Sequence, residues 1–338
     1  MIDASWLVHA AVGLLPALCF LTALLLLDSY KLVRLRMVLT VLGVGGVVAG
    51  ICYVLNAVLM DTTGLAFDTY SRYVAAAVEE SLKAAVIIVL IRTRRIGFLV
   101  DASVLGFAVG AGFATIENLY YLGQLVDPQV ATWIVRGFGT AILHGGIQAI
   151  FAALVLTNVD AQGKLGLRAV LPPLILIILV HAAFNQFMLS PIVETVLVLI
   201  SIPPLLAWVF AHSEHVLRGW LGSGFDADQE LLGLLGSDTF SQSHAGTYLY
   251  KLRERFPGQV VADLLCYLQL YVELALYAKG TLMLRENGIE VPVDDETRAK
   301  LREMEYLERS VGRAGLMTLQ PLMHTSRRDL WQLHMLGK

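Results

Sequence analysis

Residues 169–189 read AVLPPLILIILVHAAFNQFML, a stretch that contains no aspartate, glutamate, lysine or arginine. As an α-helix it is long enough to cross the roughly 30 Å hydrocarbon core of a bilayer. The whole chain is 57% hydrophobic and only 16% charged, whereas about 25% of the residues of a typical soluble domain are charged. A membrane is therefore the solvent that suits this composition.

Six further apolar runs of similar length lie on both sides of this stretch, at residues 6–27, 36–59, 74–91, 98–122, 132–157 and 191–212. Together with residues 169–189 they predict an all-α fold, a polytopic membrane helix bundle with about seven transmembrane helices. We expect this bundle to form one domain, residues 1–212.

Residues 213–338 are richer in charge and hold amphipathic segments such as 226–235 and 294–311. Apolar residues three and four positions apart among charged ones are typical of soluble helices. We therefore expect a smaller helical cytoplasmic domain here. The run 260–277 is apolar but is interrupted by acidic and amide side chains, which favours a buried or membrane-surface helix over an eighth span.

Lysine and arginine residues fall in alternate connections between the predicted spans. The clusters are Lys31, Arg34 and Arg36; Arg92, Arg94 and Arg95; Lys164 and Arg168; and Arg218. Because cytoplasmic connections carry an excess of such residues, the N-terminus is predicted outside and the C-terminus inside. The net charge of −3 offers no basic surface for nucleic acid, so nucleic acid is not an expected partner.

The third predicted span carries ionisable residues in the motif EESLK, which contains Glu79, Glu80 and Lys83. Each such side chain at bilayer depth costs about 2.5–3.5 kcal/mol on insertion scales. Lys83 lies on the helical face of both glutamates and could pair with either. That pair could serve only to fix helix packing. Two adjacent carboxylates cannot both ionise cheaply in a low dielectric, however, which leaves one of them available as a base.

The fourth predicted span contains Glu117 and Asn118 after a series of glycines that includes Gly110 and Gly112. Such glycines are typical of close helix packing rather than of chemistry. Glu117 has no basic neighbour at helical spacing on its own span. Its partner is therefore expected to come from another span.

The next two spans add a polar stripe and a histidine motif. Arg136, Thr140, His144 and Gln148 are spaced four residues apart on the fifth span, and His181 and Asn185 lie one turn apart on the sixth. In the predicted orientation, the polar groups of the third to sixth spans fall in the outer half of the membrane. Residues that merely fill space would have no reason to share this depth.

These residues resemble, in order, the motifs of the PrsW family of intramembrane proteases, E-E-x-x-K, F-x-x-x-E-N, an Arg-and-His span and H-x-x-x-N/D. The chain shows EESLK at 79–83, FATIEN at 113–118, Arg136 with His144, and HAAFN at 181–185. The resemblance covers roughly residues 70–190. It implies a multi-pass protease of a bacterial cell membrane that cleaves membrane-anchored substrate proteins, such as an anti-sigma factor, in signalling.

The PrsW family is similar to CAAX-type prenyl proteases, in which a glutamate activates water and a His/Asn pair supports the oxyanion. The resemblance implies Glu79 or Glu80 as the general base and His181 with Asn185 as the oxyanion donors. Glu117, which stands where those relatives have a histidine, would help to hold the water. Supporting roles fall to Lys83, Asn118, Arg136 and His144.

A metal centre is the alternative chemistry. His144, His181 and either Glu117 or Glu80 could form a zinc site of two histidines and one carboxylate, with an open position for water. The chain has no HExxH motif, and His144 is expected deeper in the membrane than the other groups. The sequence therefore favours glutamate catalysis without a cofactor over zinc.

Two other classes of protein share these features. Intramembrane Glu, His and Lys also line the ion paths of transporters and channels, although the chain shows no inverted repeat of the kind many transporters contain. A catalytically inactive membrane scaffold is the other alternative. The amphipathic cytoplasmic segments fit a domain that binds a regulatory protein.

Overall fold

A computed structural model describes residues 4–125, 129–289, 291–323 and 327–336. These residues form helices and turns with no strand among them, so the predicted all-α polytopic bundle is confirmed. The chain divides into two compact units, Met1–Glu214 and His215–Lys338. Its orientation across a membrane stays a prediction.

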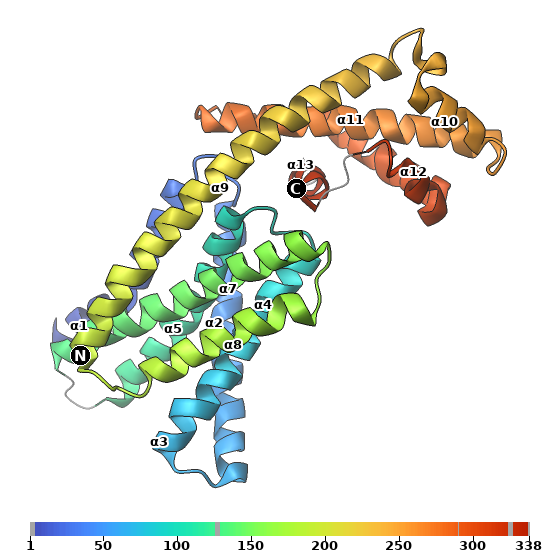
Figure 1. The fold of residues 1–338 in the computed structure, drawn as a ribbon. Coiled ribbons are helices and arrows are strands. Elements are labelled where there is room, and N and C mark those ends of the chain that lie inside the picture. The colour runs from blue at the N-terminus through green and yellow to red at the C-terminus, as the bar shows by residue number, and fades with distance from the viewer. Residues whose placement is uncertain (1–3, 126–128, 290, 324–326, 337–338) are drawn as a thin grey trace. The chain divides into compact units, whose positions relative to one another are not determined.

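Ten helical elements and part of a long eleventh one build the described part of the first unit (Figure 1). They are α1 (Ala4–Leu27), α2 (Leu35–Thr63), α3 (Phe67–Thr69), the π-helical η1 (Tyr70–Ala75), α4 (Ala76–Arg92), α5 (Leu99–Gln124), α6 (Val130–Ile134), the π-helical η2 (Val135–Thr140), α7 (Ala141–Gln162), α8 (Leu167–Phe184) and the first part of α9 (Pro191–Leu235).

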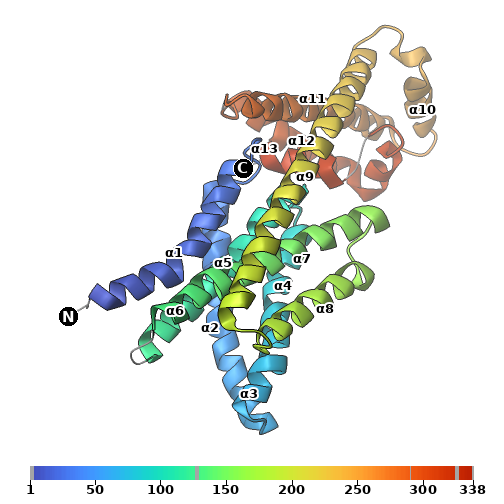
Figure 2. The same ribbon diagram turned by 60° about the vertical axis from the view of Figure 1, so that its left-hand side comes forward.

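Helices α5 and α7 form the buried centre of this unit and run side by side (Figures 1 and 2). Glycine makes this closeness possible, as the sequence predicted. A Cβ atom at Gly110 would overlap the backbone carbonyl of His144 on α7, and one at Gly112 would overlap the carbonyl of Leu42 on α2. The backbone of α5 can therefore touch two neighbouring helices.

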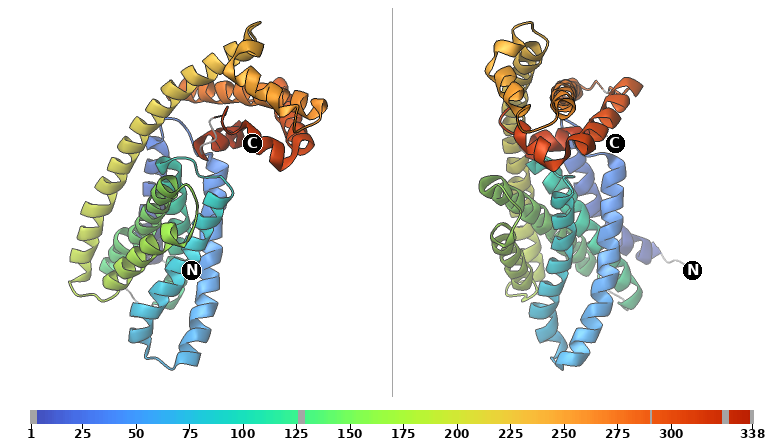
Figure 3. Two further views of the ribbon diagram at one scale, coloured as in Figure 1. Left: turned by 45° about the vertical axis from the view of Figure 1, so that its right-hand side comes forward. Right: turned by 90° about the vertical axis from the view of Figure 1, so that its right-hand side faces the viewer.

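Helices α2 and α4 form a hairpin that is closed by α3 and η1 (Figure 3). The buried side chains of α4 include Glu80 and Lys83. π-Helical segments often occur at functional sites because they change the direction in which the following turns face. Here η1 immediately precedes the EESLK motif.

Two helix ends differ clearly from the sequence prediction. The sixth span ends at Phe184 and not at residue 189, because Asn185 to Ser190 form a non-helical turn in which Phe187 has a φ of 49°. The helix of the seventh predicted span does not end at 212, since α9 continues as one helix to Leu235. Pro203 and Pro204 within it are tolerated, as in many membrane helices.

The described residues contain seven helices long and apolar enough to span a membrane, but the set differs from the predicted one. The helix α4 is absent from it, because a span of 17 residues with four charges is short and polar. The helix α11 (Gly258–Glu286) is present in it. Its assignment as a buried or membrane-surface helix stays a prediction.

The second unit combines the end of α9 with η3 (Phe240–Gln242), α10 (His244–Leu252), α11, α12 (Asp295–Leu319) and α13 (Arg327–Leu336). Asp294 caps α12, since its side chain accepts a hydrogen bond from the backbone N–H of Thr297 at 2.7 Å. The buried Lys279 of α11 pairs with the buried Asp228 of α9 at 2.5 Å. This pair gives α11 an internal polar partner.

Candidate active site

Glu80 is the centre of the polar cluster and is completely buried. Its carboxylate accepts hydrogen bonds from Lys83 Nζ at 2.5 Å and from Gln148 Nε2 at 2.6 Å. His181 Nδ1 lies 2.7 Å from the same carboxylate. Helices α4, α7 and α8 therefore meet at one side chain. Of the two adjacent glutamates, Glu80 is the one that pairs with Lys83.

His144 connects this centre to Glu117. Lys83 Nζ lies 2.9 Å from His144 Nδ1, and Glu117 Oε2 lies 3.2 Å from His144 Nε2. The His144 and His181 rings meet edge to face with their centroids 4.8 Å apart. His144 is not too deep to join the other groups, because the glycine contact at Gly110 brings its turn of α7 against α5.

Glu117 finds its basic partner on another helix, as the sequence predicted. Arg136 Nη2 donates to Glu117 Oε1 at 3.0 Å, and Arg136 Nε donates to Asn118 Oδ1 at 2.9 Å. The Arg136 guanidinium also stacks on the Tyr121 ring, 3.7 Å from its centroid. Asn118 Nδ2 donates to the carbonyl of Gly13 at 2.7 Å. These contacts tie the start of the α6–α7 segment to α5 and α1.

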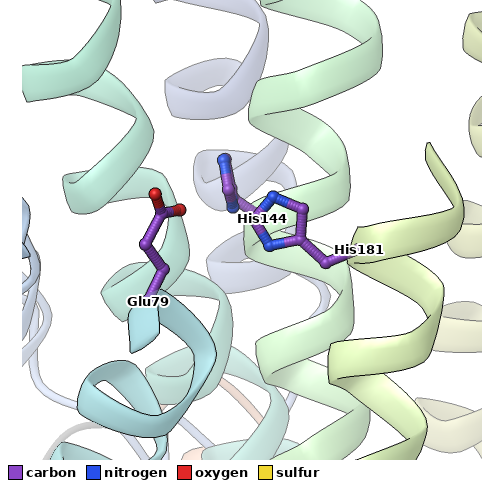
Figure 4. Close-up of side chains that lie close together, drawn as sticks. All are labelled: Glu79, His144 and His181. Carbon is purple, nitrogen blue, oxygen red and sulfur yellow. The ribbon is translucent and has the colours of Figure 1, made fainter. Parts of the chain in front are cut away.

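Glu79 makes fewer hydrogen bonds than Glu80 within the described residues. Within the described residues it accepts one hydrogen bond, from Asn56 Nδ2 at 3.5 Å, and the Asn56 side chain in turn accepts a hydrogen bond from Tyr70 O–H at 3.0 Å. Its side chain is only partly buried. Figure 4 shows the Glu79 carboxylate directed toward the rings of His144 and His181. A carboxylate with spare acceptor capacity beside two imidazoles is suited to hold water.

Asn185 is the predicted oxyanion donor that makes no hydrogen bond to the carboxylates of this cluster among the described residues. Its Nδ2 donates to the carbonyl of Ser71 in η1 at 3.3 Å. It thus holds the end of α8 against the segment that leads into α4. An amide group carries two hydrogens, so one remains for another acceptor.

Three contributors were missed or assigned a lesser role from sequence. Asn56 and Tyr70 lie outside every motif, and nothing in their spacing signals a contact with Glu79. Gln148 belongs to the predicted polar stripe, where it has no assigned role, yet it donates directly to Glu80. Only its position four residues after His144 could have indicated this role.

One group of described residues has the donors of a metal centre. Glu79, His144 and His181 each offer a ligand atom, and these atoms lie within 4.8 Å of one another. Two histidines and a carboxylate are a catalytic zinc set, and the Glu80 contact to His181 Nδ1 is the carboxylate–histidine support typical of such sites. The carboxylate in this group is Glu79, and not Glu117 or Glu80 as the sequence predicts.

One contact opposes a cation at this position. The ammonium group of Lys83 lies against His144 Nδ1, and Glu117 occupies the other ring nitrogen. A neutral imidazole has one donor and one acceptor nitrogen, so both are used here. The residues fit zinc in type and separation, and His144 would have to give up one of these contacts to bind it.

Comparison with known proteins agrees with these motifs. The profile described as PrsW family intramembrane metalloprotease matches residues 33–209. Searches of curated proteins and of solved structures gave no match. The matched region exceeds half of the chain and contains all four motifs, from Glu79 to Asn185. This chain is therefore a multi-pass membrane protein that belongs to the PrsW family of intramembrane metalloproteases.

Proposed function

We propose that this protein is an endopeptidase that hydrolyses membrane-anchored proteins within the outer half of the bilayer, with Glu79 as the general base. The observation that carries the proposal is the difference between the two adjacent glutamates. Glu80 is surrounded by Lys83, Gln148 and His181, whereas Glu79 is partly exposed and faces the two histidines.

The proposed reaction uses groups of this chain at each step. Glu79 takes a proton from a water molecule as the oxygen attacks the scissile carbonyl carbon. The negative charge that forms on the carbonyl oxygen is stabilised by His181, and by the second amide hydrogen of Asn185 once substrate is bound. Glu79 then passes its proton to the leaving amine, which breaks the C–N bond.

The residues around Glu79 position this chemistry. Glu80 fixes His181 through Nδ1, which leaves Nε2 for the reaction. Lys83 neutralises Glu80 and contacts His144. Glu117 and Arg136 hold the other side of His144 in place.

Zinc is the second candidate for this site, because the family is described as metalloproteases and Glu79, His144 and His181 form a suitable donor set. When bound, zinc would lower the pKa of a water ligand and polarise the scissile carbonyl. In that case these three residues would be its ligands and Glu80 would orient His181. The metal-free mechanism remains our first proposal because of the Lys83 contact to His144.

The substrate is proposed from the family resemblance and from the site. A cluster on membrane helices is reached most directly by a segment of a single-span protein, and an anti-sigma factor or a similar signalling protein is the substrate that the PrsW resemblance suggests. The second unit is proposed as cytoplasmic and as the place where a regulatory protein binds. A bacterial cell membrane is the proposed location.

The test is cleavage of single-span reporter proteins by the purified full-length chain in liposomes. We expect the wild type to release the reporter, and Glu79→Gln and His181→Ala to be inactive while still inserted and folded. Full cleavage by both variants would refute the proposal. Ion flux without proteolysis would favour a transporter, and a chelator-sensitive, zinc-containing active enzyme would replace the metal-free mechanism.

A further inference from the structure

An apolar groove lies beside the polar cluster, between α7, α8 and α9. Its volume is about 520 Å³. The wall is built from aliphatic and aromatic side chains such as Ile147, Val180, Phe184 and Leu197, and its polar members are Glu194 and Ser201. All of these residues belong to the first unit.

Glu194 is the unusual member of this wall. Its side chain is almost fully buried, with 7% of the residue exposed. Oε1 accepts a hydrogen bond from the backbone N–H of Leu189 at 3.2 Å, but Oε2 has no hydrogen-bond partner within the described parts of the chain. A buried acceptor without a partner is costly, and a carboxylate is costlier than a neutral group. Capping the turn before α9 needs only one oxygen, so the second oxygen indicates a missing donor.

The position of the groove relates it to the polar cluster. Ile147 follows His144 by three residues on α7, and Phe184 follows His181 by three residues on α8. Residues three apart on a helix are neighbours on its surface. An occupant of the groove would therefore lie next to the two histidines of the proposed active site.

The size and chemistry of the groove fit a helix. One helical turn, about 5.4 Å long and 10–12 Å wide with its side chains, fills on the order of 400–600 Å³, which is close to the volume of the groove. Lipid acyl chains would match the apolar wall but supply no donor for Oε2. A transmembrane helix with one polar side chain supplies both.

We propose that this groove docks the transmembrane helix of the substrate, and that Glu194 selects helices that carry a hydrogen-bond donor side chain near the outer end of the span. This inference rests on the proposed function, since it names the substrate feature that the same site would read. The docked helix would place its outer juxtamembrane segment beside Glu79, His144 and His181.

The first test measures position. Photo-crosslinking residues are placed at Leu197, which lines the groove, and at the adjacent Val196, which does not. The two residues have similar exposed fractions, 45% for Leu197 and 49% for Val196. The probe is a Leu/Ala helix of about 20 residues with one Asn in its outer half. The full-length Glu79→Gln variant is used, so that crosslinking does not depend on hydrolysis.

We expect the probe to crosslink at Leu197 and not at Val196. A second pair on α8 repeats the comparison, with Val180 in the groove and the adjacent Leu179 outside it. Equal crosslinking within both pairs would overturn the docking proposal. Selective crosslinking together with a wild-type enzyme that cleaves no reporter would refute the proposed function but not the groove.

The second test measures the role of Glu194. Glu194→Met keeps the length of the side chain and removes both oxygens, and Asp61→Leu removes an exposed carboxylate from the end of α2 as the matched control. We expect Glu194→Met to weaken binding of the Asn probe by about 3- to 30-fold, and to leave binding of an all-apolar probe unchanged. Asp61→Leu should change neither. Glu194→Gln, which retains an acceptor for Leu189, checks that the turn still folds.

Two outcomes would overturn the role of Glu194. Equal weakening of both probes would show that Glu194 only supports the fold. Binding of the Asn probe that rises when phosphatidylethanolamine vesicles are replaced by phosphatidylcholine vesicles would show that a lipid ammonium group occupies the groove instead.

Discussion

Glu79 and Glu80 are adjacent in sequence, and the structure predicts that replacing Glu80 by glutamine lowers the stability, whereas replacing Glu79 by glutamine lowers the activity. Glu80→Gln should destabilise the protein strongly, because the new amide group would face three donors, Lys83, Gln148 and His181. Glu79→Gln should leave the fold intact and remove the base. The two variants therefore separate a structural carboxylate from a catalytic one.

The magnitudes follow from the contacts. Lys83 has no exposed surface and would lose the one carboxylate that lies within 4 Å of it among the described residues, and breaking a buried ion pair costs about 3–5 kcal/mol. This corresponds to a fall in melting temperature of roughly 6–20 °C on the scaling for 150–250 residues. Glu79 would lose one long contact, to Asn56 at 3.5 Å, worth at most about 1 kcal/mol. Loss of a general base lowers the rate by about 10²- to 10⁴-fold.

The assay combines thermal unfolding of the purified protein in detergent with the rate of reporter cleavage in liposomes. A double variant, Glu80→Met with Lys83→Met, is the control, because it removes both charges and should recover the part of the stability lost in Glu80→Gln that comes from the unpaired Lys83. An unchanged melting temperature for Glu80→Gln combined with a large fall for Glu79→Gln would show that the two roles have been assigned the wrong way round.

Three further predictions test other parts of the structure. Gly110→Ala should lower the free energy of unfolding by about 1–3 kcal/mol and reduce cleavage, because its Cβ would displace the backbone of His144. Melting curves measure the loss of stability. A variant with an unchanged melting temperature would contradict the close packing of α5 on α7. Burial raises the pKa of Asp28, in the connection between α1 and α2, from 3.8 to about 6. Because this carboxyl binds its proton more tightly in the folded state, the free energy of unfolding of the protein falls as the pH rises from about 4 to 6, by about 3 kcal/mol in total. Asp28→Asn should therefore be more stable than wild type at pH 7 and equal to it near pH 4. A difference in stability between the two proteins that does not change with pH would refute this. In the second unit, Lys279→Met should cost about 3–5 kcal/mol by leaving Asp228 buried without its partner, as judged by limited proteolysis of that unit, and a double variant that also carries Asp228→Leu should recover the resistance.

The helices could be predicted from the sequence because the hydrophobic signal is local. An apolar run such as 169–184 must be helical in a bilayer whatever surrounds it, since its backbone groups can find hydrogen-bond partners only within the segment. The boundaries were less predictable. The end of α8 at Phe184 depends on the turn at Asn185 to Ser190, and the apolar residues 187–189 extend the hydrophobic signal past that end.

Most residues of the polar cluster could be predicted from the sequence because ionisable side chains are unusual in membrane spans. Ionisable residues are so costly in a membrane that those present at a shared depth stand out from the sequence. Glu117 was expected to need a partner from another helix, and Arg136 provides it. Asn56 and Tyr70 could not be found in this way, because neutral polar residues and tyrosine are common near helix ends in membranes.

The sequence by itself determined that this is a helical membrane protein, which residues are chemically exceptional, and through its four motifs which family it resembles. Only the tertiary structure decided which of the two adjacent glutamates Lys83 neutralises, that Glu79 and not Glu117 stands with both histidines, and that Glu194 has an oxygen without a partner beside an apolar groove. The physical reason is that hydropathy and motif order act along the chain. Partner choice depends instead on distances of a few ångströms between side chains on different helices, which are set by how closely glycine-bearing faces such as that of α5 allow the helices to pack.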